Sequence, residues 1–223
     1  MIELLNVYKT FGKKSILRDI SLKIVQGRAL GLVGKSGAGK TTLAHLLLGK
    51  TTPTSGTILF EGEDIALFSR AEKKAFGQKV QLIFQNPYSS LNPRMQVTDI
   101  IQEPLLIHKK QKRVDSRELL LAVGLKPEDA KKYPHQFSGG QRQRIAIARA
   151  LALEPRLLIC DEALASLDLV AQLEIISLLK QLREDRGLTY LFISHNLLAV
   201  RLVATEIVTL ADEPIQLKKL TIF

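Results

Sequence analysis

The sequence predicts an α/β fold built on a mostly parallel sheet. Four short runs of Leu, Ile, Val and Phe lack polar alternation, as is typical of strands covered on both faces. They are ALGLV at 29–33, VQLIF at 80–84, LLIC at 157–160 and YLFIS at 190–194. Helical patterns separate these runs, and such alternation is typical of an α/β core.

Three helices are expected in this core, at 41–48, 141–153 and 169–184. Pro155 follows the second helix and Gly187 follows the third, which are common end signals. The third helix has a clear apolar stripe. The expected inward residues are Leu169, Leu173, Ile176 and Leu179, and the expected outward residues are Glu174, Lys180 and Arg183.

Two regions lie outside this alternation. Residues 2–26 and 56–65 are interpreted as a small antiparallel β subdomain, with turns at Phe11-Gly12 and Glu61-Gly62. Residues 92–135 contain short helices, one of them with Asp115 or Ser116 as its N-terminal cap and Gly124 as its stop. The prediction is therefore a single domain over 1–223, with an α-helical subdomain over 86–137 inserted in the α/β core.

The composition suits a globular protein of the cytosol. The 223 residues are 46% hydrophobic and 24% charged, and no apolar run approaches the roughly 18 residues that span a bilayer. No signal peptide is recognisable at the start. The net charge of +10 favours anionic partners, although the basic run at 108–113 is expected to be a solvated loop. Cys160, the only cysteine, is expected to be an inert buried thiol.

The first glycine-rich stretch matches G-x-x-x-x-G-K-[ST] between a predicted strand and a predicted helix. The alternative is an ordinary glycine turn. Backbone N–H groups of such a loop bind phosphate oxygens at a helix N-terminus. Lys40 would contact the β and γ phosphates, and the Thr41 hydroxyl would bind Mg²⁺. The expected nucleotide-binding residues are Gly34, Lys35, Ser36, Gly37, Ala38, Gly39, Lys40, Thr41 and Thr42.

Polar residues follow the other predicted strands at their carboxyl ends, where α/β sheets bind ligands. These residues are Gln85, Asp161, Glu162 and His195. Asp161 is expected to hold Mg²⁺, because hard oxygen ligands suit that ion. Glu162 is expected to orient or deprotonate the attacking water, and His195 to contact the γ-phosphate. Taken alone, the Asp-Glu pair could be a solvated turn and His195 a surface histidine.

A second glycine-rich stretch, QFSGGQRQR at 136–144, also opens a helix. Ser138 can cap that helix, and Gly139 and Gly140 leave the amides accessible to an anion. One nucleotide does not need both glycine loops. The residues alone also permit a glycine-rich helix start with Arg142 and Arg144 on a solvated face.

Several motifs occur in a fixed order: the glycine loop, Gln85, FSGGQ at 137–141, LLICDE, SLD at 166–168 and ISHN at 193–196. In this order the chain resembles ATP-binding cassette (ABC) ATPases over about residues 2–210. The resemblance implies two cassettes facing head to tail, where Ser138, Gly139, Gly140 and Gln141 grip the ATP on the partner's P-loop. It also implies that Phe11 stacks on adenine, with Tyr8 as a second candidate. Gln85 is implied both as a Mg²⁺ ligand, with Thr41 and Asp161, and as a catalytic residue, with Glu162 and His195.

Longer stretches, including FQNPYSSLNPRMQV and YPHQFSGGQRQR, look like the dipeptide, oligopeptide and nickel importer ATPases. Ala163 and the stretch LDLVAQ favour the second ATPase subunit of the nickel importer. Three positions depart from the usual pattern: Phe137 replaces leucine, Ala165-Ser166 reverses Ser-Ala, and Asn196 stands where aspartate is common.

The resemblance implies an ATP-hydrolysing motor subunit of an importer, with ATP and Mg²⁺, that drives uptake of nickel, a metal chelate or short peptides. Expected partners are a second ATPase subunit, identical or different, two integral membrane permease subunits, and indirectly an extracytoplasmic solute-binding protein. The expected location is the cytoplasmic face of the cell membrane, peripherally and without a transmembrane segment. No nucleic acid is expected. The alternatives are a soluble cassette ATPase acting on nucleic acid or ribosomes, and an ATP-binding regulatory subunit.

Overall fold

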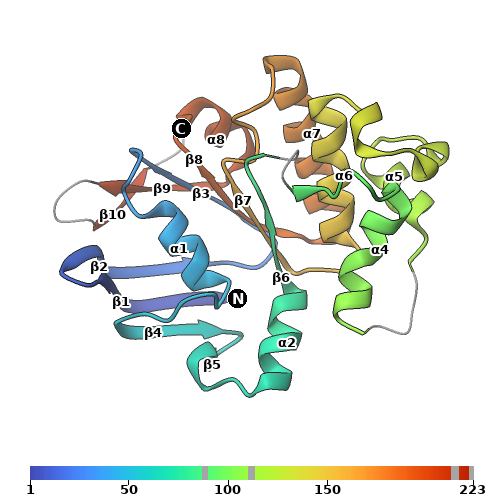
Figure 1. Ribbon diagram of the computed structural model, residues 1–223. Helices are drawn as coiled ribbons and strands as arrows, with labels where there is room; N and C mark the ends of the chain where they lie inside the picture. The colour runs from blue at the N-terminus through green and yellow to red at the C-terminus, as the bar shows by residue number, and fades with distance from the viewer. Residues whose placement is uncertain (87–89, 110–113, 212–215, 221–223) are drawn as a thin grey trace.

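The computed structural model describes residues 1–86, 90–109, 114–211 and 216–220. Its centre is a six-stranded sheet of order β10-β9-β3-β8-β7-β6, in which only β10 pairs antiparallel (Figure 1). The strands are β3 (Ala29–Gly34), β6 (Val80–Ile83), β7 (Leu157–Asp161), β8 (Thr189–Ser194), β9 (Glu206–Ala211) and β10 (Gln216–Leu220). All four predicted apolar runs form strands of this sheet, which confirms the predicted α/β class; β9 and β10 were not predicted.

A second, antiparallel sheet has the order β2-β1-β4-β5, as expected for the N-terminal region. Its strands are β1 (Ile2–Phe11), β2 (Lys14–Ile24), β4 (Ser55–Phe60) and β5 (Glu63–Asp64). Helix α1 (Lys40–Leu47) lies between the two sheets (Figure 1). Leu43, Leu46 and Leu47 of this helix share one buried apolar cluster with residues of both sheets. The glycine loop is therefore fixed between two layers.

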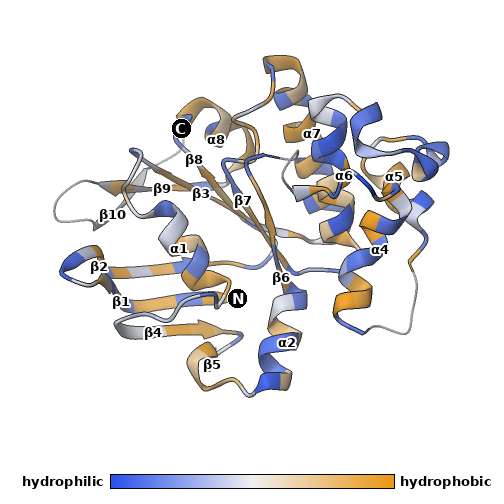
Figure 2. Ribbon diagram, viewed as in Figure 1, coloured by the Kyte–Doolittle hydropathy of each residue, from blue (hydrophilic) through white to orange (hydrophobic). Residues whose placement is uncertain are grey.

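The opposite face of the central sheet is covered by helices α6 (Gly139–Leu151), α7 (Leu169–Arg186) and α8 (Leu197–Val203). Helices α4 (Val97–Ile107) and α5 (Ser116–Ala122) pack against α6. Figure 2 shows the central strands as largely hydrophobic and the outer helices as mixed. The remaining helical elements are α2 (Arg70–Lys79) and the 3₁₀ turns Ile65–Leu67, Pro127–Lys131 and Pro134–Gln136. None of the helices in the described ranges is long and apolar enough to cross a membrane.

Helix ends follow local capping chemistry. Of the two expected caps of α5, Asp115 is the one used, since its carboxylate accepts a hydrogen bond from the Arg117 N–H at 2.8 Å. The helix expected at 141–153 begins earlier, at Gly139, because Ser138 caps it. Gly187 ends α7 in the left-handed conformation, with φ of 63°.

The expected inward stripe of α7 is partly wrong. Leu169 and Leu173 are 70% and 47% exposed, whereas Ile176 and Leu179 are buried. The buried residues of this helix begin at Ile175. Its first turns are covered only on the side of Ala171, which packs against the core, so Leu169 and Leu173 stay exposed. Arg183 is half-buried, while Glu174 and Lys180 are exposed as expected. Most of the basic run at 108–113 lies outside the described residues.

Candidate nucleotide-binding site

The glycine loop connects β3 to α1 through backbone that requires glycine. Gly37 and Gly39 have φ of 82° and 88°, in the left-handed region. A Cβ on Gly39 would lie 2.9 Å from Leu17 Cδ2, and one on Gly34 would lie 3.0 Å from the Leu210 carbonyl oxygen. The N-terminus of α1 has no side-chain cap. Its amide donors are therefore available to an anion.

Lys40 is held inside this loop. Its side chain is 8% exposed, and Nζ donates to the carbonyl oxygens of Gly34 at 2.7 Å and Lys35 at 2.9 Å. A buried ammonium is stable only with polar and anionic partners. The loop therefore fits a phosphate group, with the Lys40 charge already oriented.

A cavity of about 570 Å³ lies over the loop. It brings the glycine loop, also called the P-loop, together with all four polar residues that were predicted because they follow strand ends. The lining residues are Ile16, Ser36, Gly37, Gly39, Lys40, Thr41, Thr42, Gln85, Asp161, Glu162 and His195. Ile16 was not expected, because it comes from β2 of the antiparallel sheet and belongs to no motif.

Asp161 ends β7 at the floor of the cavity. Burial raises the pKa of its carboxyl and Glu162 adds to the rise, while a hydrogen bond from the Thr41 hydroxyl and the charges of His45 and Lys40 oppose it. Thr41, Asp161 and Gln85 present hydroxyl, carboxylate and amide oxygens to one cavity. Such hard oxygen donors fit Mg²⁺.

Glu162 and His195 form a hydrogen-bonded pair. Glu162 Oε2 lies 2.9 Å from His195 Nδ1, and Oε1 accepts from the His195 backbone N–H at 3.2 Å. The Glu162 N–H donates to the Ile193 carbonyl at 2.9 Å, which joins the end of β7 to the end of β8. The carboxylate orients the imidazole through Nδ1, and the second ring nitrogen, Nε2, can donate to a phosphate oxygen when it carries a proton.

The second glycine stretch lies apart from this cavity. Ser138 Oγ accepts from the Gln141 N–H at 3.3 Å, and Gln141 Oε1 accepts from the Ser138 N–H at 3.0 Å. This capping box fixes the first turn of α6. Ser138 and Gln141 are exposed, and residues 138–141 do not line the P-loop cavity.

Phe11, the expected adenine-stacking residue, is 53% exposed at the end of β1. The Lys9 ammonium lies 4.7 Å from the centroid of its ring and donates to the Thr52 carbonyl at 2.7 Å. Tyr8, the weaker candidate, is 38% exposed. Neither aromatic lines the P-loop cavity.

The three departures from the expected pattern have clear surroundings. Phe137 is buried, and Asn196 caps α8 by accepting from the Leu198 and Ala199 N–H groups at 3.0 and 3.3 Å. Ser166 donates to the Gln85 carbonyl at 3.2 Å.

Cys160 is fully buried, as expected, and burial with the neighbouring Asp161 charge raises the pKa of its thiol to about 12.

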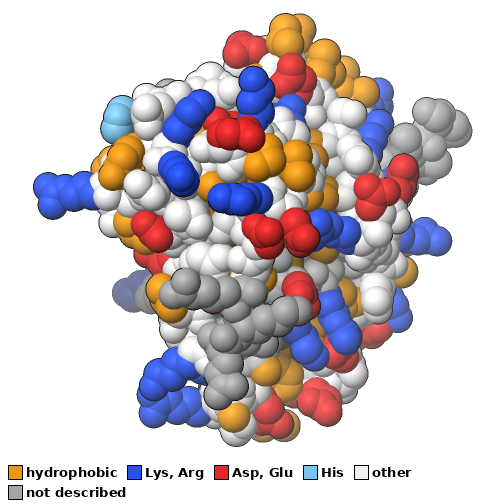
Figure 3. Space-filling model, turned by 90° about the vertical axis from the view of Figure 1, so that its right-hand side faces the viewer, with side chains coloured by type: hydrophobic (Ala, Val, Ile, Leu, Met, Phe, Trp, Pro, Cys, Tyr) orange, Lys and Arg blue, Asp and Glu red, His pale blue; other side chains and the backbone are white. Residues whose placement is uncertain are grey.

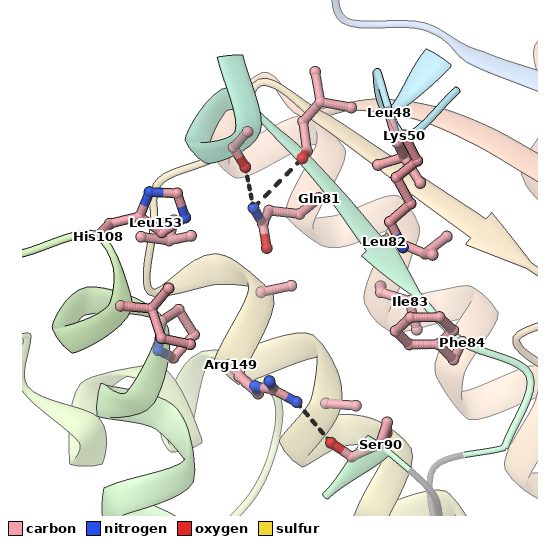
Figure 4. Close-up of a pocket in the computed structure, with 16 residues that line it drawn as sticks. Leu48, Lys50, Gln81, Leu82, Ile83, Phe84, Ser90, His108, Arg149 and Leu153 are labelled. Carbon is pink, nitrogen blue, oxygen red and sulfur yellow. Dashed lines mark hydrogen bonds between the residues drawn. The ribbon is translucent and has the colours of Figure 1, made fainter. Parts of the chain in front are cut away.

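A groove of about 300 Å³ lies between β6, α4 and α6, and no motif predicted it (Figure 4). The Arg149 guanidinium lines it, donating to the Ser90 carbonyl at 2.6 Å and pairing with Glu103 at 2.9 Å. The Lys50 ammonium lies 5.5 Å from the ring centroid of Phe84. The groove also has apolar walls, formed by Leu48, Leu82, Ile83, Ile107 and Leu153.

The strand–loop–helix geometry, the buried Lys40 and the polar strand ends define a P-loop nucleotide-binding protein. Residues 17–165 match the family model described as ABC transporter. The chain belongs to the ABC transporter family and carries its ATP-binding ATPase domain.

The relatives in this family are transport proteins. The putative oligopeptide transport ATP-binding protein YkfD of Bacillus subtilis (strain 168) is 45% identical over 204 residues, which cover 88% of this chain and 62% of that protein. OppF, an oligopeptide transport ATP-binding protein of the same strain, is 47% identical over 202 residues, 88% of this chain and 66% of OppF. The dipeptide transport ATP-binding protein DppF of Escherichia coli (strain K12) is 43% identical over 198 residues, which cover 87% of this chain and 59% of DppF. The chain thus spans about three fifths to two thirds of the length of these relatives. Their names specify peptides and give no support to nickel.

Solved structures agree with the fold. The ATP-binding cassette MJ0796, described as a dimer in a post-hydrolysis state with ADP and Pi, has a TM-score of 0.84 and 27% identity, covering 100% of this chain and 99% of that chain. The structure of cbiO1 from Clostridium perfringens, part of the ABC transporter complex cbiONQ, has a TM-score of 0.86 and 25% identity, covering 97% and 86%.

Proposed function

We propose that this protein is the ATP-hydrolysing motor subunit of an importer of short peptides. The observation that carries the proposal is the Glu162–His195 pair, which lines the same cavity as Lys40 and Asp161. A carboxylate in this position can act as general base toward a water at a phosphate held by the loop. The peptide-transport names of relatives at 43–47% identity support the choice of cargo.

In this proposal the amides of Gly37, Gly39 and Lys40 and the Lys40 ammonium hold the phosphates. Thr41, Asp161 and Gln85 would hold Mg²⁺, which would neutralise charge on the phosphates. Glu162 accepts the proton of the attacking water. His195, held by Glu162 through Nδ1, turns Nε2 toward the γ-phosphate. Phe11 stacks on the adenine.

Residues Ser138–Gln141, called here the Ser138–Gln141 corner, contact a nucleotide bound to the P-loop of a second cassette. That cassette is either another copy of this chain or a different ATPase. The exposure of the corner, and its distance from the lining of the chain's own P-loop cavity, support this assignment. The dimeric description of MJ0796 also supports it. Closure of the two cassettes over ATP and their reopening after hydrolysis would drive transport.

The groove of Figure 4 is the proposed docking site for the permease subunits. It joins β6, which leads to Gln85, to α4 of the helical region, so a partner seated there would contact both. Its mixed apolar and cationic walls suit an amphipathic segment with an acidic residue. The protein would then lie peripherally at the cytoplasmic face of the membrane, and a solute-binding protein would act on it only through the permeases.

The alternative of a nucleic-acid or ribosome ATPase is less favoured. Recognition of a polyanionic surface calls for a clustered basic patch. On the face drawn in Figure 3, acidic and basic side chains are interspersed, together with hydrophobic ones. Tight, salt-dependent binding of RNA or DNA by the purified protein would favour that alternative.

Replacing Glu162 by Gln tests the catalytic assignment. The variant should keep its ATP affinity and lose turnover by about 100-fold or more, because the amide cannot accept a proton. Glu184→Gln, which removes an exposed charge on α7, should change neither quantity. Measurement in the assembled complex, with only this subunit's glutamate intact, also separates a motor from a regulatory subunit. Undiminished turnover of Glu162→Gln would refute the assignment.

The cargo has its own test. The native complex, reconstituted in lipid, should show higher ATP turnover with short peptides and their binding protein than without them. Stimulation by nickel or a nickel chelate instead of peptides would replace the peptide by the metal as substrate.

A further inference from the structure

The loop at 163–168 joins Glu162 to helix α7 and is fixed by its own hydrogen bonds. The Ala165 N–H donates to the Glu162 carbonyl at 3.0 Å, and the Leu167 N–H donates to the Leu164 carbonyl at 3.1 Å. At its far end, Asp168 caps α7. A rigid loop of this kind can hold a second segment in place.

The loop also contacts that second segment. Ser166 Oγ donates to the carbonyl oxygen of Gln85, with 3.2 Å between the two oxygens. Strand β6 ends at Ile83, so the Gln85 carbonyl lies beyond the sheet ladder and is held instead by this side chain. The Gln85 side chain lines the cavity with Asp161 and Glu162.

The order Ala165-Ser166 determines this contact. Alanine has no hydroxyl, so the bond to Gln85 depends on the serine being the second residue of the pair. The loop also lies close to the start of α6, because a Cβ on Gly139 would lie 3.4 Å from Leu167 Cδ2. The loop therefore lies between the corner proposed to meet the partner cassette and the residue proposed to reach Mg²⁺.

We propose that Ser166 is a positioning residue for hydrolysis, which acts by fixing the backbone of Gln85 so that its amide enters the site. This inference rests on the proposed function, because it requires that Gln85 takes part in hydrolysis. Ser166 itself does not line the cavity, so its effect on hydrolysis passes through Gln85.

The first test is Ser166→Ala in the assembled complex. One lost hydrogen bond of ordinary strength should lower kcat by about 2-fold to 10-fold. At saturating Mg²⁺ the KM for ATP and the melting temperature should stay within error, because Ser166 is exposed and outside the cavity. Ser166→Thr, which keeps the hydroxyl, should restore kcat. A lower melting temperature together with an equal loss in Ser166→Thr would show a merely structural role.

The sequence offers a matched control. Ala165→Ser alone should leave kcat unchanged, and the exchange Ala165→Ser with Ser166→Ala should be as slow as Ser166→Ala. A fully active exchange variant would overturn the inference, because the position of the hydroxyl would then be irrelevant.

A double-mutant cycle with Gln85→Ala tests whether Ser166 acts through the Gln85 side chain. In that background Ser166→Ala should cause no further loss of kcat. If Gln85→Ala lowers turnover while Ser166→Ala alone does not, the role of Ser166 is excluded and the proposed function of Gln85 survives. If Gln85→Ala itself retains turnover, both assignments fail. Equal effects of Ser166→Ala in both backgrounds would exclude action through Gln85.

Discussion

Glu162 has a backbone φ of 51°, in the left-handed region that non-glycine residues seldom occupy. Such a conformation costs about 1–3 kcal/mol and persists only where the surroundings hold it. Here the Ile193 carbonyl fixes the Glu162 N–H, and His195 fixes the carboxylate. The strain lies at the residue to which hydrolysis is assigned, which is where such strain commonly occurs.

Lys40→Ala tests the phosphate site. A charge-assisted hydrogen bond is worth about 1.5–3 kcal/mol, so ATP should bind about 10-fold to 150-fold more weakly. Isothermal titration calorimetry measures this directly. Lys14→Ala, at an exposed lysine of β2, is the control and should bind normally. Unchanged affinity in Lys40→Ala would contradict the proposed cradle.

Cys160 should be chemically inert in the folded protein. With a thiol pKa of about 12, only about one molecule in ten thousand carries a thiolate at pH 8, and the sulfur is also inaccessible. An aromatic disulfide reagent should therefore react only after the protein is unfolded in guanidinium. Rapid, stoichiometric reaction of the native protein would show that the centre of β7 opens readily.

The positions of the cavity-lining residues were predictable where a residue directly follows a parallel strand. Gln85, Asp161, Glu162 and His195 all follow buried parallel strands, whose carboxyl ends share one edge, and all four line the cavity. Ile16 could not be predicted this way, because it reaches the cavity from the antiparallel sheet. Leu169 and Leu173 were placed wrongly, since a helical period does not reveal which turns a neighbour covers.

At the scale of elements, helix α6 contains an unusual buried amide. Gln143 is fully buried, and neither its Nε2 nor its Oε1 has a hydrogen-bond partner in the described part of the chain. An unsatisfied buried polar group costs about 1–3 kcal/mol. Gln143 lies two residues after Gln141, so the cost falls on the helix that presents residues 138–141.

Gln143→Met should therefore stabilise the protein by about 1–3 kcal/mol, because methionine fills a similar volume without polar atoms. Urea unfolding measures the difference. Gln181→Met, at an exposed position of α7, should remain within about 0.5 kcal/mol of the parent. Destabilisation by Gln143→Met would mean that the amide makes a bond in solution.

Elements were predictable where burial leaves a periodic pattern. Helix α2 was missed because its sequence RAEKKAFGQK is polar on nearly all sides and buries only Phe76. Its start was nevertheless encoded in the capping box formed by Ser69 and Glu72. Strand β9 was missed because its short apolar run follows α8 with only two intervening residues, so no turn signal separates them.

At the scale of the whole molecule, the chain presents two glycine-rich helix starts, which in the proposed function are two half-sites. The P-loop cavity lies over α1 between the sheets, and the Ser138–Gln141 corner begins α6 in the helical layer. Residues 138–141 do not line the P-loop cavity of their own chain. In the proposed head-to-tail arrangement, two cassettes would complete both half-sites, which would account for two glycine-rich helix starts in one chain.

A high-resolution structure of the assembled Glu162→Gln complex with ATP and Mg²⁺ is the most direct measurement of this arrangement. Each γ-phosphate on a P-loop should lie within hydrogen-bond distance of the Ser138 hydroxyl and the Gly140 N–H of the opposing cassette, when that cassette is a copy of this chain, or of the equivalent groups when it is not. A closed, ATP-loaded assembly in which the Ser138–Gln141 corner faces solvent would contradict the account.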